Sequence, residues 1–298
     1  MTDQNESERP VVGLGEILWD VFPSGRRLGG APANFAYHAA QFGHRALVVS
    51  AVGFDRKGND IISELARRSL PAHIDRVPFP TGTVKADISD ADSPIYTIRT
   101  RCAWSHIPFT DELLEIASAA RAVCFGTLAQ WNRESRGTIL RFLDACPGDC
   151  LKILDINLRQ RYFTKATIRE SLRRADILKL NEAELSVVTG LLGYKLAGEE
   201  LLCSRLMRSY GLKMIILTKG TDGSVIVHGG GKSFRGAPKV KTVSTVGAGD
   251  AFTGAFIGSL LNGKSIGEAH GIAVNVAAYV CTRSGAMPKI PDQVKSGG

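Results

Sequence analysis

The sequence predicts an α/β fold with a Rossmann-like, three-layer core, a mostly parallel sheet and a small additional β element. Short runs rich in β-branched residues alternate with longer segments of helical periodicity, which is the order of strand–helix–strand units. The runs are apolar rather than alternating, as strands covered on both faces are. Residues 83–101 break this rhythm. The 298 residues are expected to form one domain, residues 1–298.

The main sheet is expected to contain at least six strands, joined by right-handed crossovers. The predicted strands are residues 11–15, 46–52, 122–125, 152–155, 177–180 and 214–217. The clearest helices between them are residues 59–68, 110–120 and 134–146.

A second, smaller sheet is predicted from residues 83–89 and 95–99, which alternate between apolar and polar positions. Residues 90–94 between them supply turn residues, so the two strands form an antiparallel hairpin. Residues 16–27 are expected to pair with it. A lid made approximately of residues 16–30 and 82–106 is one interpretation. An ordinary edge hairpin is the other.

The stretch GSLLNGKS at residues 258–265 fits the P-loop pattern G-x-x-x-x-G-K-S. A true P-loop follows a strand and opens a helix. Here the preceding residues have helical periodicity, Asn262 and Gly263 form a helix stop, and Ser265 with Glu268 forms a capping box. We therefore predict a corner between two helices.

A better phosphate site lies upstream, where residues 240–244 look like a strand and TVGAGD at residues 245–250 leads into a helix. The N–H groups of residues 247–250 are expected to lie unpaired at the positive helix end, where they would bind an anion. Asp250 is either a first-turn acid that stabilises the helix dipole or a general base. As a base it would take a proton from a hydroxyl that attacks a phosphate.

Composition excludes few functions. The net charge is +8, but the basic residues are scattered and no run of five exists, so we expect no nucleic-acid partner. None of the six cysteines forms a C-x-x-C pair, and we expect reduced, buried thiols. No run approaches the roughly 18 apolar residues that span a bilayer. We expect a cytoplasmic protein without a membrane partner.

Two stretches carry a family resemblance, GGAPANFAYHAAQFG at residues 29–43 and the turn at residues 245–250. They resemble the two signatures of the ribokinase-type (PfkB) carbohydrate kinase family. Further family motifs are resembled by DINLR at residues 155–159, NEAE at residues 181–184, TKG at residues 218–220 and TRSGA at residues 282–286. The resemblance covers residues 11–291.

The resemblance implies a ribokinase-like fold and an ATP-dependent kinase that phosphorylates a hydroxyl. It implies that Asp250 is the base and that Arg159 pairs with phosphate oxygens. Gly247, Ala248 and Gly249 would form the anion hole. Asn181 and Glu184 would hold the Mg²⁺–phosphate unit, with Glu184 acting on the metal through water. The other nucleotide-binding residues that it implies are Thr218, Lys219, Gly220, Gly223 and Asn275.

On the acceptor side, Asp20 and Asn34 match family positions that hydrogen-bond sugar hydroxyls. Gly29 and Gly30 would let a ligand hydroxyl approach the backbone. Trp104, beside the hairpin, is either core or a cover for the apolar face of the sugar. The stretch GEILWDVFP at residues 15–23 is most like the fructokinase branch, which implies fructose.

Two departures bear on ligands. Ser244 stands where relatives that bind a monovalent cation carry an Asp ligand, so such a site is doubtful here. Ala31 stands where ribokinases often carry Lys, which disfavours ribose. Other acceptors, namely ribose, a keto-deoxy sugar acid or a nucleoside, remain alternatives. A non-catalytic sugar- or nucleotide-binding regulator is the alternative of another class. A homodimer through the lid is the only protein partner that the resemblance suggests.

Overall fold

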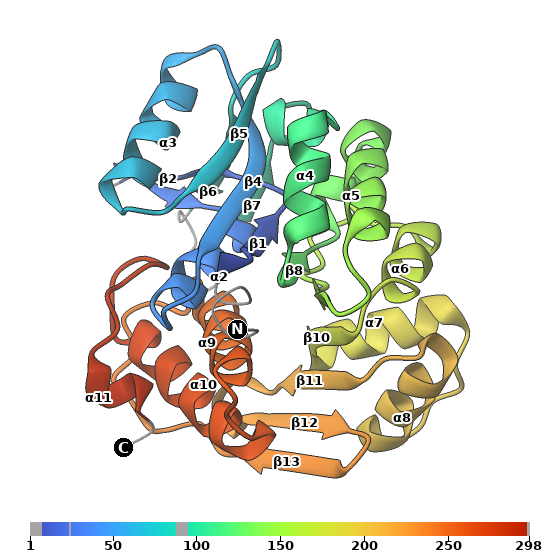
Figure 1. Ribbon diagram of the computed structural model, residues 1–298. Coiled ribbons are helices and arrows are strands. Elements are labelled where there is room, and N and C mark those ends of the chain that lie inside the picture. The colour runs from blue at the N-terminus through green and yellow to red at the C-terminus, as the bar shows by residue number, and fades with distance from the viewer. Residues whose placement is uncertain (1–7, 24, 88–94, 297–298) are drawn as a thin grey trace.

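The computed structural model describes residues 8–23, 25–87 and 95–296, and Figure 1 shows its layers. The main sheet has nine strands in the order β13-β12-β11-β10-β9-β8-β1-β4-β5. Seven neighbouring strands, from β11 to β5, are parallel, while β12 and β13 are antiparallel. Their bounds are β1 Val11–Leu14, β4 Ala46–Gly53, β5 Ala72–Val77, β8 Ala122–Phe125, β9 Leu151–Asp155, β10 Ile177–Asn181, β11 Met214–Thr218, β12 Ser224–His228 and β13 Gly231–Arg235.

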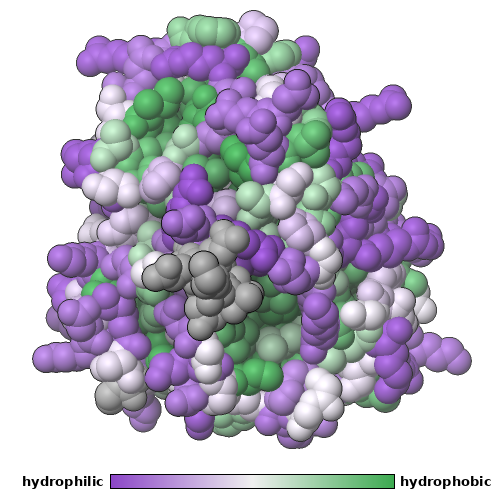
Figure 2. All heavy atoms as spheres, in the orientation of Figure 1, coloured by the Kyte–Doolittle hydropathy of each residue, from purple (hydrophilic) through white to green (hydrophobic). Residues whose placement is uncertain are grey.

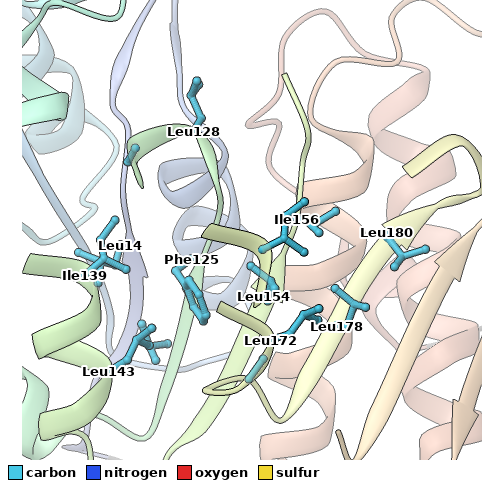
Figure 3. Packing of buried hydrophobic residues seen from close by; sticks show 14 of the residues in the cluster. Leu14, Phe125, Leu128, Ile139, Leu143, Leu154, Ile156, Leu172, Leu178 and Leu180 are labelled. Atoms are coloured by element: carbon cyan, nitrogen blue, oxygen red, sulfur yellow. The ribbon is translucent and has the colours of Figure 1, made fainter. Parts of the chain in front are cut away.

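Helices cover both faces of this sheet, which confirms the three-layer prediction. One face carries α4 (Asp111–Ala119), α5 (Arg133–Ala145), α6 (Lys165–Leu172), α7 (Glu182–Leu192) and α8 (Glu199–Tyr210). The other carries α2 (Ala31–Ala40), α3 (Arg56–Arg67), α9 (Ala248–Leu261) and α10 (Ile266–Cys281), and the short α11 (Asp292–Lys295) packs on α10. Figure 3 shows Leu154 and Leu178 from neighbouring strands pointing into the first of these layers, towards Phe125 and Leu172.

All six predicted strands are present, each within one residue of its expected bounds. Helix α3 begins three residues earlier than predicted, because the Asp55 side chain accepts a hydrogen bond from the N–H of Gly58 and caps it. The strand predicted at residues 240–244 is wrong. This segment hydrogen-bonds to a helix end instead of a strand, since the N–H groups of Val243 and Ser244 both donate to the carbonyl of Cys281.

The small sheet contains four strands in the order β3-β2-β6-β7, with β2 Leu18–Phe22, β3 Gly25–Gly29, β6 Gly82–Asp87 and β7 Ile95–Ile98. The predicted hairpin (β6 and β7) and its pairing with residues 16–27 are confirmed, although β2 and β6 run parallel. The predicted turn at residues 90–94 lies outside the described residues.

The predicted lid extends too far at its end. Residues Ala103–His106 form a short 3-10 helix that packs against β4 in the core. Trp104 is fully buried there, and a Cβ on Gly82 would come within 2.4 Å of its indole ring. The idea that Trp104 covers a bound sugar is therefore wrong.

The GSLLNGKS stretch forms the predicted helix corner. Helix α9 ends at Leu261, Asn262 caps it, and Gly263 has a φ of 78°. Ser265 and Glu268 then form a capping box that starts α10. The segment therefore lacks the strand–loop–helix order of a P-loop.

The surface is mixed in character. Figure 2 shows hydrophilic side chains over most of one face, with apolar ones gathered over α3 and β5. A groove there is lined by Ile62, Leu65, Leu70 and Ile74 among others. None of the helices within the described ranges is long and apolar enough to cross a membrane.

Candidate active site

The glycine-rich turn opens α9, as predicted. Gly247 caps the helix with a φ of 80°, and a Cβ at this position would lie 2.3 Å from the Cβ of Ala286. The expectation of four unpaired amides needs one correction, because the N–H of Ala248 donates to the carbonyl of Thr245 at 3.3 Å and closes the turn. Within residues 8–296 as described, no hydrogen bond from the N–H of Gly247, Gly249 or Asp250 is found. Three amides thus remain to bind an anion.

Asp250 lies in the first turn of α9 and faces α2. The amide nitrogen of Asn34 donates a hydrogen bond of 2.7 Å to its Oδ2. The two helices pack closely enough that a Cβ on Gly254 would lie 2.8 Å from the Cβ of His38. Burial raises the pKa of Asp250 to about 6, with a further rise from Asp155 and opposing effects from Lys179, Asn34 and Arg159. Such a carboxylate is basic enough to accept a proton near neutral pH.

Asn34 is 4% exposed, so it is no ordinary surface residue of the helix. Its Nδ2 contacts Asp250, and its Oδ1 has no hydrogen-bond partner among the described residues. A buried acceptor without a partner costs free energy. A donor from a ligand or from water is therefore expected at this atom.

Two more acids from the β1–β2 segment belong to the same electrostatic cluster. Burial raises the pKa of Asp20 to about 6, against the opposing charge of Arg159. Burial also raises the pKa of Glu16 to about 7, and Asp250 adds to this effect. Arg159, which is exposed, opposes the rise at all three carboxyl groups. The site combines three carboxyl groups with one guanidinium.

The paired glycines are required by close packing at both positions. Gly30 caps α2 with a φ of 116°, and a Cβ there would lie 2.4 Å from the carbonyl oxygen of Glu16. A Cβ on Gly29 would lie 2.2 Å from Oδ2 of Asp20. Both positions hold β2 and β3 against the start of α2, which brings Asp20 and Asn34 to the same end of the main sheet.

The N-x-x-E motif forms a capping box at the start of α7. The Asn181 side chain accepts from the N–H of Glu184, and Oε2 of Glu184 accepts from the N–H of Asn181. The other carboxylate oxygen accepts from the N–H of Leu158, in the loop that leads to Arg159. Both carboxylate oxygens of Glu184 therefore accept a backbone hydrogen bond, which fixes this side chain beside the loop that carries Arg159. Among the described residues no group of three His, Cys, Asp or Glu side chains is arranged to hold a metal.

The remaining nucleotide residues lie at the carboxyl end of β11 and in the turn after it. Thr218 is the register partner of Asn181. The Lys219 ammonium lies 2.8 Å from Glu199 and 3.2 Å from Glu182. Gly220 and Gly223 have φ values of 55° and 103°. A Cβ on Gly223 would lie 2.0 Å from the carbonyl oxygen of Arg235, so that glycine packs the turn against β13.

Asn275 is partly buried on α10. No hydrogen bond joins it to the other predicted nucleotide residues within the described part of the chain. The structure therefore brings Asn181, Glu184 and Thr218 together and leaves Asn275 on a separate element.

Sequence reasoning missed three residues of this site, namely Glu16, Lys179 and the side chain of Asp155. Lys179 lies inside the run ILKL, which we expected to be covered on both faces. A charge at such a position needs a buried counter-ion, and Asp155 ends the neighbouring strand. That signal was available in the sequence. Glu16 gives a similar signal, as an acid between Gly15 and Ile17.

The chain is similar in sequence to several sugar kinases over nearly its whole length. It is 26% identical over 307 residues to the ATP-dependent 6-phosphofructokinase of Thermoanaerobacterium thermosaccharolyticum, covering 97% of this chain and 92% of that protein. It is 29% identical over 318 residues to fructokinase-1 of Oryza sativa subsp. japonica, covering 96% and 95%. The 5-dehydro-2-deoxygluconokinase of Bacillus thuringiensis is 25% identical over 298 residues, covering 95% and 87%.

Solved structures agree on the fold. The crystal structure of fructokinase with bound ATP from Xylella fastidiosa superposes with a TM-score of 0.83 at 18% identity, covering 97% of this chain and 98% of that one. The model of the pfkB family carbohydrate kinases matches residues 23–293. With the glycine-rich turn, the acid at the start of its helix and the small sheet in place, the chain belongs to the pfkB family of carbohydrate kinases.

Proposed function

We propose that this protein transfers the γ-phosphoryl group of ATP to a hydroxyl of a neutral sugar, and that fructose is the acceptor. The observation that carries the proposal is the juxtaposition at the start of α9. Three amides without hydrogen bonds in the described structure adjoin a carboxyl group whose pKa is raised to about 6. An anion site beside a base matched to neutral pH is what phosphoryl transfer requires.

Asp250 acts as the general base. The acceptor oxygen forms its bond to the γ-phosphorus, the bond from that phosphorus to the β,γ-bridging oxygen breaks, and the hydroxyl proton moves to Asp250. The N–H groups of Gly247 and Gly249 stabilise the charge on the transferring group, and Arg159 pairs with phosphate oxygens. The hydrogen bond from Asn34 orients the carboxylate. Glu184 would hold Mg²⁺ through water, and the metal would neutralise phosphate charge when it is bound with the nucleotide.

The nucleotide lies along the carboxyl ends of β10 and β11. Asn181 and Thr218 are neighbours there, and the turn with Lys219, Gly220 and Gly223 follows directly. Asn275 on α10 completes the purine side. Ligands of open α/β sheets bind at this edge.

The acceptor lies between the first turns of α2 and α9 and the small sheet, which we assign as the lid. Asp20 and Asn34 hydrogen-bond its hydroxyls. The charge balance supports a neutral acceptor, because three acids, Glu16, Asp20 and Asp250, share this end of the site, and among the described cations Arg159 is the one that opposes the rise in pKa at all three. Lys179 also acts on Asp250, but it is paired with Asp155. A phosphorylated sugar or a sugar acid would meet like charge. This argument separates the chain from relatives whose names indicate a sugar phosphate or a sugar acid.

An ADP-release assay with a panel of acceptors tests the proposal. The panel contains fructose, ribose, adenosine, fructose 6-phosphate and a keto-deoxy sugar acid, each with Mg·ATP. We expect the highest kcat/KM with fructose. A higher value with either anionic acceptor would overturn the charge argument. Binding of sugar or nucleotide without ADP release from any acceptor would indicate a regulator and overturn the kinase assignment.

A further inference from the structure

A buried ion pair lies directly behind the candidate anion hole. Lys179 is 8% exposed and Asp155 is 4% exposed, and they are register partners on β10 and β9. The Lys179 ammonium donates to Oδ1 of Asp155 at 3.1 Å. Neighbours in register on parallel strands point to the same face, so both side chains reach towards α9.

The pair is in contact with the first turn of α9. Thr253 is fully buried, and its hydroxyl is within 3.4 Å of Oδ2 of Asp155 and donates to the carbonyl of Gly249 at 3.0 Å. A Cβ added to Gly249 would lie 2.9 Å from Nζ of Lys179. The ammonium therefore occupies the space that a side chain at position 249 would need, and the turn rests on it.

This location is electrostatically unfavourable for a purely structural lysine. The start of α9 already carries the positive end of the helix dipole, and the burial of any cation is costly. Asp155 compensates the charge of Lys179, and Asp250 and Glu184 favour the charged form as well. An apolar pair of the same volume would fill the same space without this cost. A charged pair at this place changes the pKa of Asp250, which an apolar pair would not do.

We propose that Asp155 and Lys179 are a positioning pair for the phosphoryl transfer proposed above. They support the amide-bearing turn from the side of the sheet. Their opposite charges also shift the protonation equilibrium of Asp250 in opposite directions. Asp155 favours the protonated acid, and Lys179 favours the carboxylate that acts as base. The inference rests on the proposed function, but the effect of the pair on the pKa of Asp250 does not depend on the reaction.

Several other groups around Asp250 also influence its pKa, so they must stay unchanged in the variants that test the proposal. The charged and titratable groups that face it from the packed elements are Glu16, Asp20, Cys124, Asp155, Arg159 and Lys179. Asn34 adds a neutral hydrogen bond. Of these groups, Cys124, Asp155 and Lys179 belong to strands of the main sheet, and Asp155 and Lys179 form the ion pair whose charges the test removes.

The test is the pH profile of kcat for Lys179→Met and Asp155→Asn. Loss of the lysine charge raises the pKa of Asp250. The acid limb of the kcat–pH profile, where kcat falls because Asp250 becomes protonated, therefore moves to higher pH. Loss of the aspartate charge moves the limb to lower pH. We expect shifts of about 0.5–1 pH unit in these opposite directions. In the double variant, which leaves no unpaired buried charge, the limb returns towards its wild-type position.

Two control variants separate this effect from general damage. Thr253→Val removes the hydroxyl that contacts both Oδ2 of Asp155 and the carbonyl of Gly249, without a change in charge. It therefore lowers kcat and leaves the acid limb of the kcat–pH profile in place. Lys213→Met removes an exposed ion pair with Asp176 at the other end of the sheet and changes neither quantity. Acid limbs that stay in place, or that move the same way in both single variants, would overturn the proposal.

A second readout covers the cases in which a single variant folds poorly or the wild type transfers no phosphoryl group. The carboxyl ¹³C chemical shifts of protein labelled at aspartate report the titration of Asp250 directly. The Asp250 signal is assigned by its absence from the spectrum of Asp250→Asn. The wild type and the double variant titrate Asp250 at similar pH, and Lys179→Gln titrates it at higher pH. An unchanged titration in Lys179→Gln contradicts the pairing. If the wild type transfers no phosphoryl group but the titration of Asp250 still differs between the variants in this way, only the proposed function is contradicted.

Discussion

At the scale of single residues, the site depends on what surrounds Asp250. Asn34 donates to one of its oxygens, and Asp155, Glu16 and Asp20 place negative charge nearby. A first-turn acid of an exposed helix end would keep an ordinary pKa and serve the helix dipole alone. The pKa of Asp250 is instead raised to about 6, which agrees with the proposed role as a base.

Asp250→Asn tests this distinction. The amide keeps the volume of the side chain and cannot accept the hydroxyl proton, so kcat falls by about two to four orders of magnitude. ATP binding, measured by calorimetry, stays within a few-fold of the wild type because the amides and the nucleotide turn are intact. The matched control is Asp111→Asn, which removes the exposed first-turn acid of α4 and leaves kcat unchanged. Near-normal turnover by Asp250→Asn would remove the base assignment.

Ser244 carries a second prediction at this scale. Its hydroxyl accepts from the N–H of Val246 at 3.3 Å, and it brings no negative charge to the start of the turn. A serine hydroxyl offers a cation a neutral oxygen and no negative charge to attract it. We therefore expect kcat to change by less than about twofold when K⁺ replaces tetramethylammonium at constant ionic strength. Strong K⁺ activation of the wild type would show that a cation site exists without a carboxylate. Ser244→Asp is the variant expected to gain K⁺ dependence.

At the scale of elements, close approach of backbones sets the positions of the helices. Gly247 and Gly263 flank α9 and have nearly equal φ values of 80° and 78°. They differ in their surroundings, because a Cβ on Gly247 would clash with Ala286, while a Cβ on Gly263 meets nothing within 4 Å. The C-terminal loop thus backs the turn at the start of α9 directly, and His38 ties this loop to α2 through a hydrogen bond of 2.8 Å to the carbonyl of Ala286.

This pair of glycines gives a matched experiment. Alanine at either position adopts a left-handed conformation, which costs roughly 1–2 kcal/mol. Gly247→Ala also displaces the turn from Ala286, so we expect a loss of kcat of at least about tenfold beyond its effect on stability. Gly263→Ala lowers the melting temperature and leaves kcat intact. Equal kcat values in the two variants would show that the turn does not form part of the catalytic site.

The sequence predicted elements well where their signals are local. The strand at residues 122–125, the capping box at Ser265 and the helix stop at Gly263 all follow from their own residues, and all are confirmed. The segment at residues 240–244 has strand-like composition but hydrogen-bonds to the end of α10, which only the tertiary fold decides. Likewise, the contact of Asn34 with Asp250 joins residues 216 positions apart.

At the scale of the whole molecule, the site has a cost in stability. Glu16 is 4% exposed, and its Oε2 has no hydrogen-bond partner among the described residues. Burial raises its pKa from the ordinary value of 4.5 to about 7. The folded protein therefore keeps a proton that the unfolded chain has lost between these values. This contribution to stability is complete below about pH 4.5 and is lost as pH rises through about 7. The buried histidines His38 and His270, whose pKa values are lowered to about 4, act in the opposite direction between pH 4 and 6.5.

Glu16→Gln isolates the carboxyl contribution, because the histidines and the other acids are the same in both proteins. The amide mimics the protonated acid, so it has little effect at pH 5 and removes a buried charge at pH 8. The shift in pKa corresponds to roughly 3 kcal/mol as an upper bound. We expect urea unfolding to show that Glu16→Gln gains stability over the wild type at pH 8 and not at pH 5. Glu115→Gln, on the exposed face of α4, is the control and shows no such dependence. A difference between Glu16→Gln and wild type that is the same at both pH values would mean that Glu16 is ionised at neither or both. If Glu16 were ionised at neither pH, the acceptor end of the site would lack one of the negative charges on which the choice of a neutral sugar depends.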